Sequence, residues 1–318
     1  MPRSYSATEL LASIRQRTFT AAAPRDFDDG SLLRLLNEKA TTYLCKLIAK
    51  RNTNYLVETV DINVAAGQPS YEVPSVAMAG AVRSVVMLVG NIPYPLEEMS
   101  LPVAIATNLI PYSTGFPTGY YWMGPNIVLY PTQSQSGTLR IHYHRRPSVV
   151  VKESACLQIN SFQGAGMPSV NYRVNFFPQI APAGFVAGAL VDTVTNIPNF
   201  YRRQTSIPVA SVTATTIDLP FAPGATVRPP GLLVGDWICL ADTAPVVTDA
   251  PAEVIDCLLQ SVAVDMLGAK GSDQSYSRAL NMLERAEQDC GPLIQQRNTG
   301  AQRKVSAFPD SPGWPWVG

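Results

Sequence analysis

The two histidines of the chain are the first candidates for chemistry, because imidazole binds metal ions and transfers protons near neutral pH. His142 and His144 stand two residues apart in an alternating segment, so a β-strand would place both on one face. A zinc site needs three or four ligands. No third ligand is evident nearby, since the nearest downstream acid, Glu153, lies beyond Pro147. We therefore interpret the pair as half-exposed strand residues and predict no metal site.

Motifs for other kinds of catalysis are missing from the sequence. It contains neither the G-x-S-x-G turn of a hydrolase nor the G-x-x-x-x-G-K-[ST] loop that holds phosphates. Gly164-Ala165-Gly166 lacks the third glycine of a dinucleotide-binding turn. The adjacent acids Glu97-Glu98 and Asp28-Asp29 lack the partner that a general acid–base pair needs. The sequence thus predicts no cofactor and no enzyme. The catalytic alternative is an enzyme acting on cell-wall polymer within residues 148–245, in which Glu153 or Asp192 would be the acid to mutate.

The five cysteines are odd in number and include no C-x-x-C pair, which argues against a zinc site or a disulfide framework. We expect reduced, mostly buried thiols. The positions are Cys45, Cys156, Cys239, Cys257 and Cys290.

Charge is scarce and balanced. The 318 residues include 24 basic and 24 acidic side chains, and charged residues make up 15% of the chain, against about 25% in typical domains. Few charges remain to repel neighbours, so we expect much of the surface to contact other subunits. Zero net charge argues against a dedicated nucleic-acid binder. The basic clusters have three interpretations: a solvated face, salt bridges between subunits, or the lining of a pore through which DNA passes. They are Arg140, Arg145 and Arg146; Arg202 and Arg203; and Arg297, Arg303 and Lys304.

Hydropathy predicts no membrane association. No segment approaches the ~20 apolar residues of a membrane span. The first residues, MPRSYSATELLASIRQR, lack the apolar core of a signal peptide, so we expect folding in the cytoplasm.

Helical periodicity appears at both ends of the sequence. Ser6 and Glu9 have the spacing of a capping box at the start of a first helix. Residues 31–51 carry an apolar stripe at spacings of three and four, which predicts an amphipathic helix. A third helix should run from Pro251 to Gly268, and a fourth should follow until it stops or kinks at Gly291-Pro292.

Alternating segments separated by turn residues predict strands between these helices. Residues 91–118 contain five prolines and are expected to be loop-rich, with at most a short helix. The expected strands are 55–62, 71–73, 82–89, 120–123, 127–130, 138–144, 170–177, 185–191, 208–219 and 236–241.

The predicted fold class is α+β, with a helical bundle, a β-rich domain and an extended C-terminal arm. N-terminal helices in 1–53 and a helical hairpin in 246–296 form the bundle. Residues 54–147 form the β-rich domain, and 148–245 form a small second domain or an insertion in the first. Residues 297–318 form the arm, whose prolines and two tryptophans cannot build a core alone.

Four segments carry a family resemblance: TVDINVAAGQPSYEVP (59–74), YWMGPNIVLYP (121–131), YHRRP (143–147) and GLLVGDWICL (231–240). In this order they resemble the head-to-tail adaptor (connector or head-completion) proteins of tailed bacteriophages. The resemblance covers most of the chain and is weakest from 150 to 230.

The resemblance implies a virion protein of the neck, in a ring of often twelve copies below the portal. Its partners would be its own copies, the portal protein, tail or nozzle proteins and DNA in transit through the channel. The arm would dock on the portal, and Arg140, Arg145, Arg146, Arg202 and Arg203 would face the channel or other subunits. The alternative is another tail component: a nozzle, tail-tube or baseplate subunit. The docking residues of the arm would be Phe308, Trp314, Trp316, Arg303 and Lys304.

Overall fold

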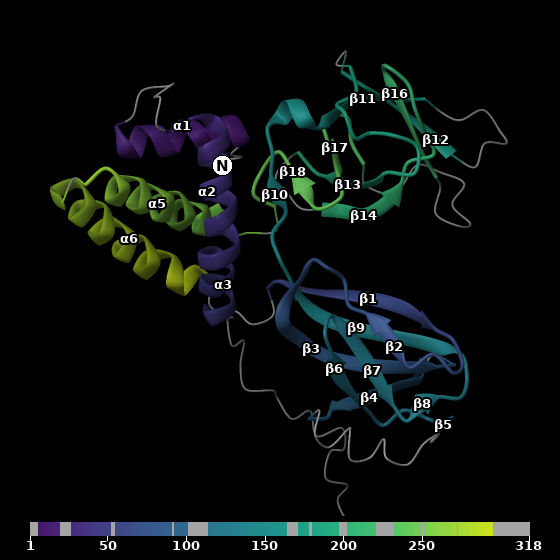
Figure 1. Cartoon of the computed structure of the whole chain (residues 1–318). Helices are drawn as coiled ribbons and strands as arrows, with labels where there is room; N and C mark the ends of the chain where they lie inside the picture. The colour runs from purple at the N-terminus through teal and green to yellow at the C-terminus, as the bar shows by residue number, and fades with distance from the viewer. Residues whose placement is uncertain are drawn as a thin grey trace, which may run out of the picture.

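A computed structural model shows, in the residues that it describes, four helices beside two β-rich units (Figure 1). This confirms the predicted α+β class. The structure describes residues 6–19, 27–51, 55–90, 92–100, 114–163, 171–177, 180–196, 202–220, 232–248, 250, 252–271 and 273–294.

The N-terminal helices begin with the side-chain caps that the sequence predicts. α1 (Ala7–Thr18) has the complete capping box of Ser6 and Glu9. α2 (Asp29–Lys39) is capped by Asp28, whose side chain accepts the backbone N–H of Ser31. α2 continues through one π turn, η1 (Ala40–Leu44), into α3 (Cys45–Arg51), so the predicted helix over 31–51 is confirmed.

The C-terminal helices form the predicted antiparallel pair. α5 (Ala252–Ala269) and α6 (Asp273–Ile294) are joined by a short turn at Gly271. The sequence predicts that α6 either stops or kinks at Gly291-Pro292. The predicted stop is wrong, because the helix continues through Pro292. Proline removes one backbone hydrogen bond, and this loss is small within a turn of the helix end.

One apolar core joins all four helices. Leu10 and Ile14 of α1, Leu36 of α2, and Leu258 and Val262 of α5 are fully buried in it. Asn37 connects these helices to the β region through two hydrogen bonds. Its side-chain amide donates to Val150 O at 2.9 Å, and its side-chain oxygen accepts the Val150 N–H at 2.7 Å.

The first β-rich unit is a seven-stranded sheet whose two halves pack on one core. Alternation places Leu139, Ile141 and Tyr143 inside, with their even-numbered neighbours half-exposed. The hairpin formed by residues 119–130 turns at Gly124, whose φ of 63° suits glycine. In sheet order the strands are β1 (Val57–Val64), β9 (Gly137–Arg145), β3 (Ala77–Val89), β4 (Ile92–Glu98), β6 (Gly119–Met123), β7 (Asn126–Tyr130) and β2 (Ser70–Glu72).

Strand β4 corrects the prediction that residues 91–118 lack strands. It contains Pro93 and Pro95, yet pairs with β3. Glu97 and Met99 donate their backbone N–H groups toward β6, so the prolines, two and four residues earlier, face the same way. The pairing with β6 begins only at Glu97, so no ladder bond is lost at either proline.

The second β-rich unit is another seven-stranded sheet, with its own core around Leu157, Ile159, Val174 and Ile217. Its first strand also contacts its sixth, so the sheet curls back on itself. In sheet order the strands are β14 (Arg202–Pro208), β13 (Leu190–Val194), β17 (Trp237–Leu240), β11 (Leu157–Gln163), β12 (Asn171–Phe176), β16 (Thr216–Pro220) and β15 (Ser211–Val212).

Two predicted strands of this unit are corrected. The strand expected at 185–191 begins only at Leu190, because Gly184 and Gly188 turn the chain at φ 113° and 85°. The strand expected at 208–219 is a hairpin that turns where Thr213 bonds Thr216. Strands β11 and β14 were not predicted.

Short elements complete the description. β10 (Val149–Val150) pairs in parallel with β18 (Thr243–Ala244), and β5 (Thr114–Gly115) pairs with β8 (Thr132–Gln133). The 3-10 turn η2 (Glu153–Ala155) precedes β11. All five cysteines are buried free thiols, as predicted. In the described residues, no helix is long and apolar enough to cross a membrane. The predicted domain boundaries stay a prediction.

Candidate functional site

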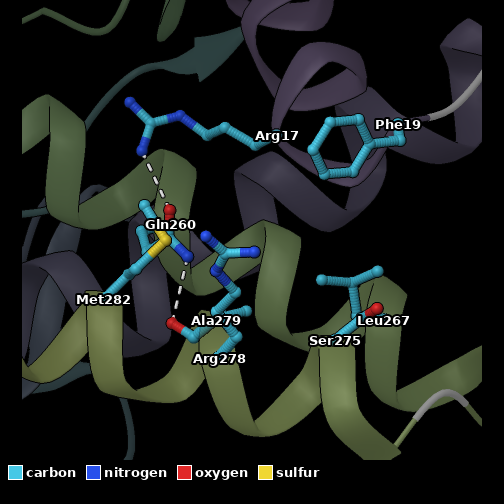
Figure 2. Close-up of a pocket in the computed structure, with 8 residues that line it drawn as sticks. All are labelled: Arg17, Phe19, Gln260, Leu267, Ser275, Arg278, Ala279 and Met282. Atoms are coloured by element: carbon cyan, nitrogen blue, oxygen red, sulfur yellow. Dashed lines mark hydrogen bonds between the residues drawn. The ribbon is translucent and has the colours of Figure 1, made fainter.

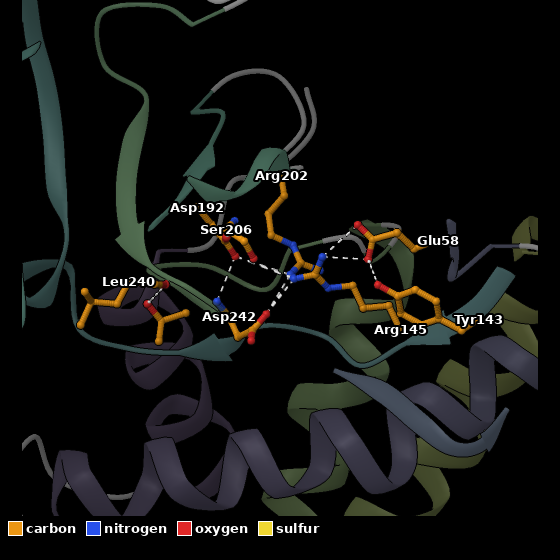
Figure 3. A network of polar contacts seen from close by, with 9 residues as sticks. Glu58, Tyr143, Arg145, Asp192, Arg202, Ser206, Leu240 and Asp242 are labelled. Carbon is orange, nitrogen blue, oxygen red and sulfur yellow. Dashed lines mark hydrogen bonds and ion pairs between the residues drawn. The ribbon is translucent and has the colours of Figure 1, made fainter. Parts of the chain in front are cut away.

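A buried charged network lies where the two β-rich units meet (Figure 3). Arg145 ends β9 and is only 7% exposed. One guanidinium nitrogen, Nη1, lies 2.9 and 2.8 Å from the two carboxylate oxygens of Glu58 on β1. The other, Nη2, lies 2.8 Å from Asp242 Oδ1, in the turn after β17. A single side chain thus links the first sheet to the second.

Asp192 supplies the buried negative charge of this charged network. Its carboxylate is fully buried on β13 and accepts the backbone N–H groups of Ser206 at 2.8 Å and Asp242 at 2.9 Å. Arg145 Nη2 and Arg202 Nη1 each lie 3.8 Å from Asp192 Oδ2. Burial raises the pKa of Asp192, and its two N–H donors and Arg145 oppose that rise.

Arg145 and Tyr143 both keep their protons in the charged network, so both can donate to Glu58. Burial acts to lower the pKa of Arg145, but the hydrogen-bonded Glu58 and the charges of Asp192 and Asp242 together outweigh it, and the net direction is upward. Burial raises the pKa of Tyr143, whose hydroxyl donates to Glu58 Oε2 at 3.1 Å. The guanidinium therefore stays charged and the phenol stays neutral.

A second feature is a pocket of about 280 Å³ between the end of α1, α5 and α6 (Figure 2). Gln260 closes one side: its Oε1 accepts from Arg17 Nη1 at 3.0 Å, and its Nε2 donates to Ala279 O at 3.0 Å. The pocket is lined by Arg17, Phe19, Gln260, Leu267, Ser275, Arg278, Ala279 and Met282.

Apolar side chains around this pocket face solvent. Phe19 is 95% exposed and Met282 is 51% exposed, and Tyr276 and Leu280 of α6 are exposed nearby in sequence. Phe19 also has a left-handed backbone, with φ 51°, which costs a non-glycine residue about 1–2 kcal/mol. An exposed aromatic ring in a strained conformation does not stabilise the isolated fold. We call Phe19, Tyr276, Leu280 and Met282 the apolar rim.

The predicted basic residues occupy different environments. Arg140 makes two hydrogen bonds, of 2.8 and 2.7 Å, with Asp61 on the outer face of the first sheet. Arg146 is exposed. Arg145 and Arg202 are buried in the charged network, so their charges are used within the chain. The side chain of Arg203 lies outside the described set.

The predicted arm residues, Arg303, Lys304, Phe308, Trp314 and Trp316, lie outside the described residues, as does Arg297.

The two histidines lie on one face of β9, as the alternation predicts. His142 Nδ1 lies 2.8 Å from Thr59 Oγ1. Burial lowers the pKa of His144, and Arg83 lowers it further. Across the described residues, no three histidine, cysteine or acidic side chains form a metal-binding group.

Both candidate catalytic acids have structural contacts. Glu153 accepts the Thr8 backbone N–H at 3.0 Å and the Thr8 hydroxyl at 2.8 Å, at the start of α1. Asp192 belongs to the charged network. Sequence reasoning missed Glu58 and Asp242 as partners of Arg145, because their contacts span 87 and 97 residues.

Comparisons with known proteins agree with the fold. The family model described as SU10 adaptor protein matches residues 5–171, just over half of the chain. The matched part contains the N-terminal helices and the whole first sheet, including Arg145 and Glu58. A search of curated proteins finds no match. The chain belongs to the SU10 adaptor protein family, a family of phage head–tail adaptors.

Proposed function

We propose that the protein forms a ring of twelve copies below the portal, where it joins the capsid to the tail and continues the DNA channel. The observation that carries this proposal is the match to the adaptor family. The role is structural, and we propose no catalytic activity for it. The ring would belong to the neck of the virion and assemble in the host cytoplasm.

The apolar rim supports contacts between copies. Two of its exposed side chains, Phe19 and Met282, line a pocket that a neighbouring subunit can fill. Contiguous exposed apolar surface on a soluble protein marks an interaction site. The low share of charged residues, 15%, also suits a chain that is largely covered by other subunits.

The charge balance supports a channel that lets DNA slide. Each phosphate contact adds affinity that depends on salt and resists movement. Arg140 is neutralised by Asp61, and the chain has no net charge. We propose that Arg140, Arg146 and Arg203 lie at the channel or between subunits.

The C-terminal segment would dock on the portal. Phe308, Trp314 and Trp316 are large rigid anchors of the kind that dominate binding energy at interfaces. Arg303 and Lys304 would add attraction to an acidic partner. Tail or nozzle proteins would bind the opposite face of the ring.

Deletion of residues 305–318 tests the docking role. The truncated subunit should keep the circular dichroism spectrum and melting temperature of the full chain but lose binding to purified portal. The matched control is a full chain with Ser306→Ala and Ser311→Ala, which keeps the aromatic anchors and should bind normally. Normal portal binding by the truncated subunit would remove the docking role from this segment.

A further inference from the structure

Two cysteines on neighbouring helices are in direct contact. The Cys257 thiol on α5 donates to Cys290 Sγ on α6 at 3.2 Å. Both side chains are buried, at 1% and 3% exposure, in the core that joins the helices. Their positions are 33 residues apart and are connected through the turn at Gly271.

We propose that Cys257 and Cys290 are a modification site, which an oxidised low-molecular-weight disulfide such as oxidised glutathione converts into a disulfide between α5 and α6. One cysteine, as its thiolate, attacks a glutathione sulfur, and one reduced glutathione leaves. The second cysteine thiolate then attacks the protein sulfur of this mixed disulfide, and the second glutathione leaves. The protein gives up two electrons and two protons, and one glutathione disulfide becomes two thiols.

Cys290 has a route to the oxidant. It lies in the last turn and a half of α6, directly before Gly291-Pro292. Pro292 has no N–H, so the carbonyl of Gln288 receives no helical hydrogen bond from it. Helix ends open locally at a lower free energy than whole-chain unfolding. Burial raises the pKa of the Cys257 thiol, and the neighbouring Cys290 raises it further, so reaction from the closed helix pair is slow.

A second thiol pair in the same chain is a built-in comparison. Cys239 forms a hydrogen bond with Cys156, and both are fully buried. Cys239 lies in β17, which pairs with β11 on one side and β13 on the other. Central strands open with the whole fold and not separately. Oxidised glutathione should therefore leave Cys156 and Cys239 reduced.

The disulfide would covalently link the C-terminal end of α6 to α5. It closes a loop of about 33 residues, which restricts the unfolded chain. We expect the melting temperature of the helical region to rise by about 5 °C. Residues 295–318 follow this end directly, so their attachment point would be held more firmly.

The test exposes the purified full-length protein to oxidised glutathione and maps its thiols by alkylation, protease digestion and mass spectrometry. Two of the five thiols should disappear, and a linked peptide should contain Cys257 and Cys290. Dithiothreitol should reverse both changes and the rise in melting temperature. Cys290→Ser should abolish the rise, and Cys45→Ser, at a buried cysteine outside the pair, should retain it.

Three outcomes would overturn the proposal: five thiols remaining after prolonged oxidation, a stable glutathione adduct without the linked peptide, or oxidation of Cys156 and Cys239 first. The peptide map of the oxidised protein without any substitution decides between these outcomes, even where Cys290→Ser fails to fold.

Discussion

Arg145 Nη2 lies 2.8 Å from Asp242 Oδ1, and this ion pair joins the last residue of β9 to the turn after β17. The same guanidinium also holds Glu58 on the first sheet. Beside this contact, β10 pairs with β18, again linking a segment after β9 to one after β17. The charged network therefore holds the two β-rich units together at one place.

Arg145→Ala should lower the free energy of unfolding by about 3 kcal/mol, because the buried Asp192 keeps only Arg202 as a cation and the partly exposed Glu58 and Asp242 lose their hydrogen-bonded partner. Urea unfolding followed by circular dichroism measures the change. Arg140→Ala is the matched control, since it removes an equally well-formed ion pair on an exposed strand face and should cost little. Equal effects of the two substitutions would contradict the structural role of the network.

Asn37→Ala should lower the free energy of unfolding by about 1–3 kcal/mol, because the N–H and C=O of Val150 both lose their partner. Asn37→Asp should also destabilise, since a carboxylate accepts the N–H but cannot donate to the carbonyl. Hydrogen exchange of the Val150 amide reports the contact directly. Unchanged exchange in Asn37→Ala would show that this bridge contributes nothing.

Phe19→Asn should separate folding from assembly. Asparagine tolerates a left-handed backbone better than phenylalanine, so the free energy of unfolding should stay equal or rise by about 0.5–1 kcal/mol. Loss of the exposed ring should weaken self-association by about tenfold, measured by analytical ultracentrifugation. Ile14→Ala is the comparison: it removes a fully buried side chain and should destabilise the subunit by about 2–5 kcal/mol. Full assembly by Phe19→Asn would remove Phe19 from the interface.

Asp218→Asn should reduce stability at neutral pH and have a smaller effect in acid. Arg173, through hydrogen bonds of 2.8 and 3.0 Å, is the main cause that lowers the pKa of Asp218, and the Ser211 hydroxyl helps. A lowered folded-state pKa means that the carboxylate stabilises the fold above its unfolded pKa of about 3.9, and that this contribution disappears as the pH falls through the folded-state value.

Urea unfolding of Asp218→Asn and the unsubstituted protein, compared from pH 7 down to pH 3, measures this effect. The difference between the two proteins should be constant near neutral pH and should shrink as the pH falls below about 4. Glu284→Gln, on the exposed side of α6, is the control and should follow the unsubstituted protein throughout. A difference that stays constant with pH would rule out the ionised pair as the cause.

Local patterns in the sequence predict local structure well. The helix over 31–51, the capping box at Ser6 and the hairpin around Gly124 depend on neighbouring residues, and all are confirmed. The resemblance to phage adaptors is confirmed by the family match. Strand β11 was missed although Leu157 and Ile159 alternate with polar residues, which is a signal that was available.

Other features could not be predicted from neighbouring residues. Strand β4 depends on which way Pro93 and Pro95 face, and that direction is set by the pairing of β3 and β6. The buried position of Arg145 depends on carboxylates 87 and 97 residues away in the sequence, and Arg202 lies near Asp192 because β13 pairs with β14. From the sequence alone, basic residues at those positions are expected at the surface, because only the folded chain places carboxylates next to them.

The most direct test of the proposed adaptor ring is electron cryomicroscopy of the purified protein bound to its portal. We expect a closed ring coaxial with the portal, with the apolar rim covered by a neighbouring copy and the C-terminal segment on the portal. Density for a lone subunit, or for a ring that leaves the portal untouched, would contradict it.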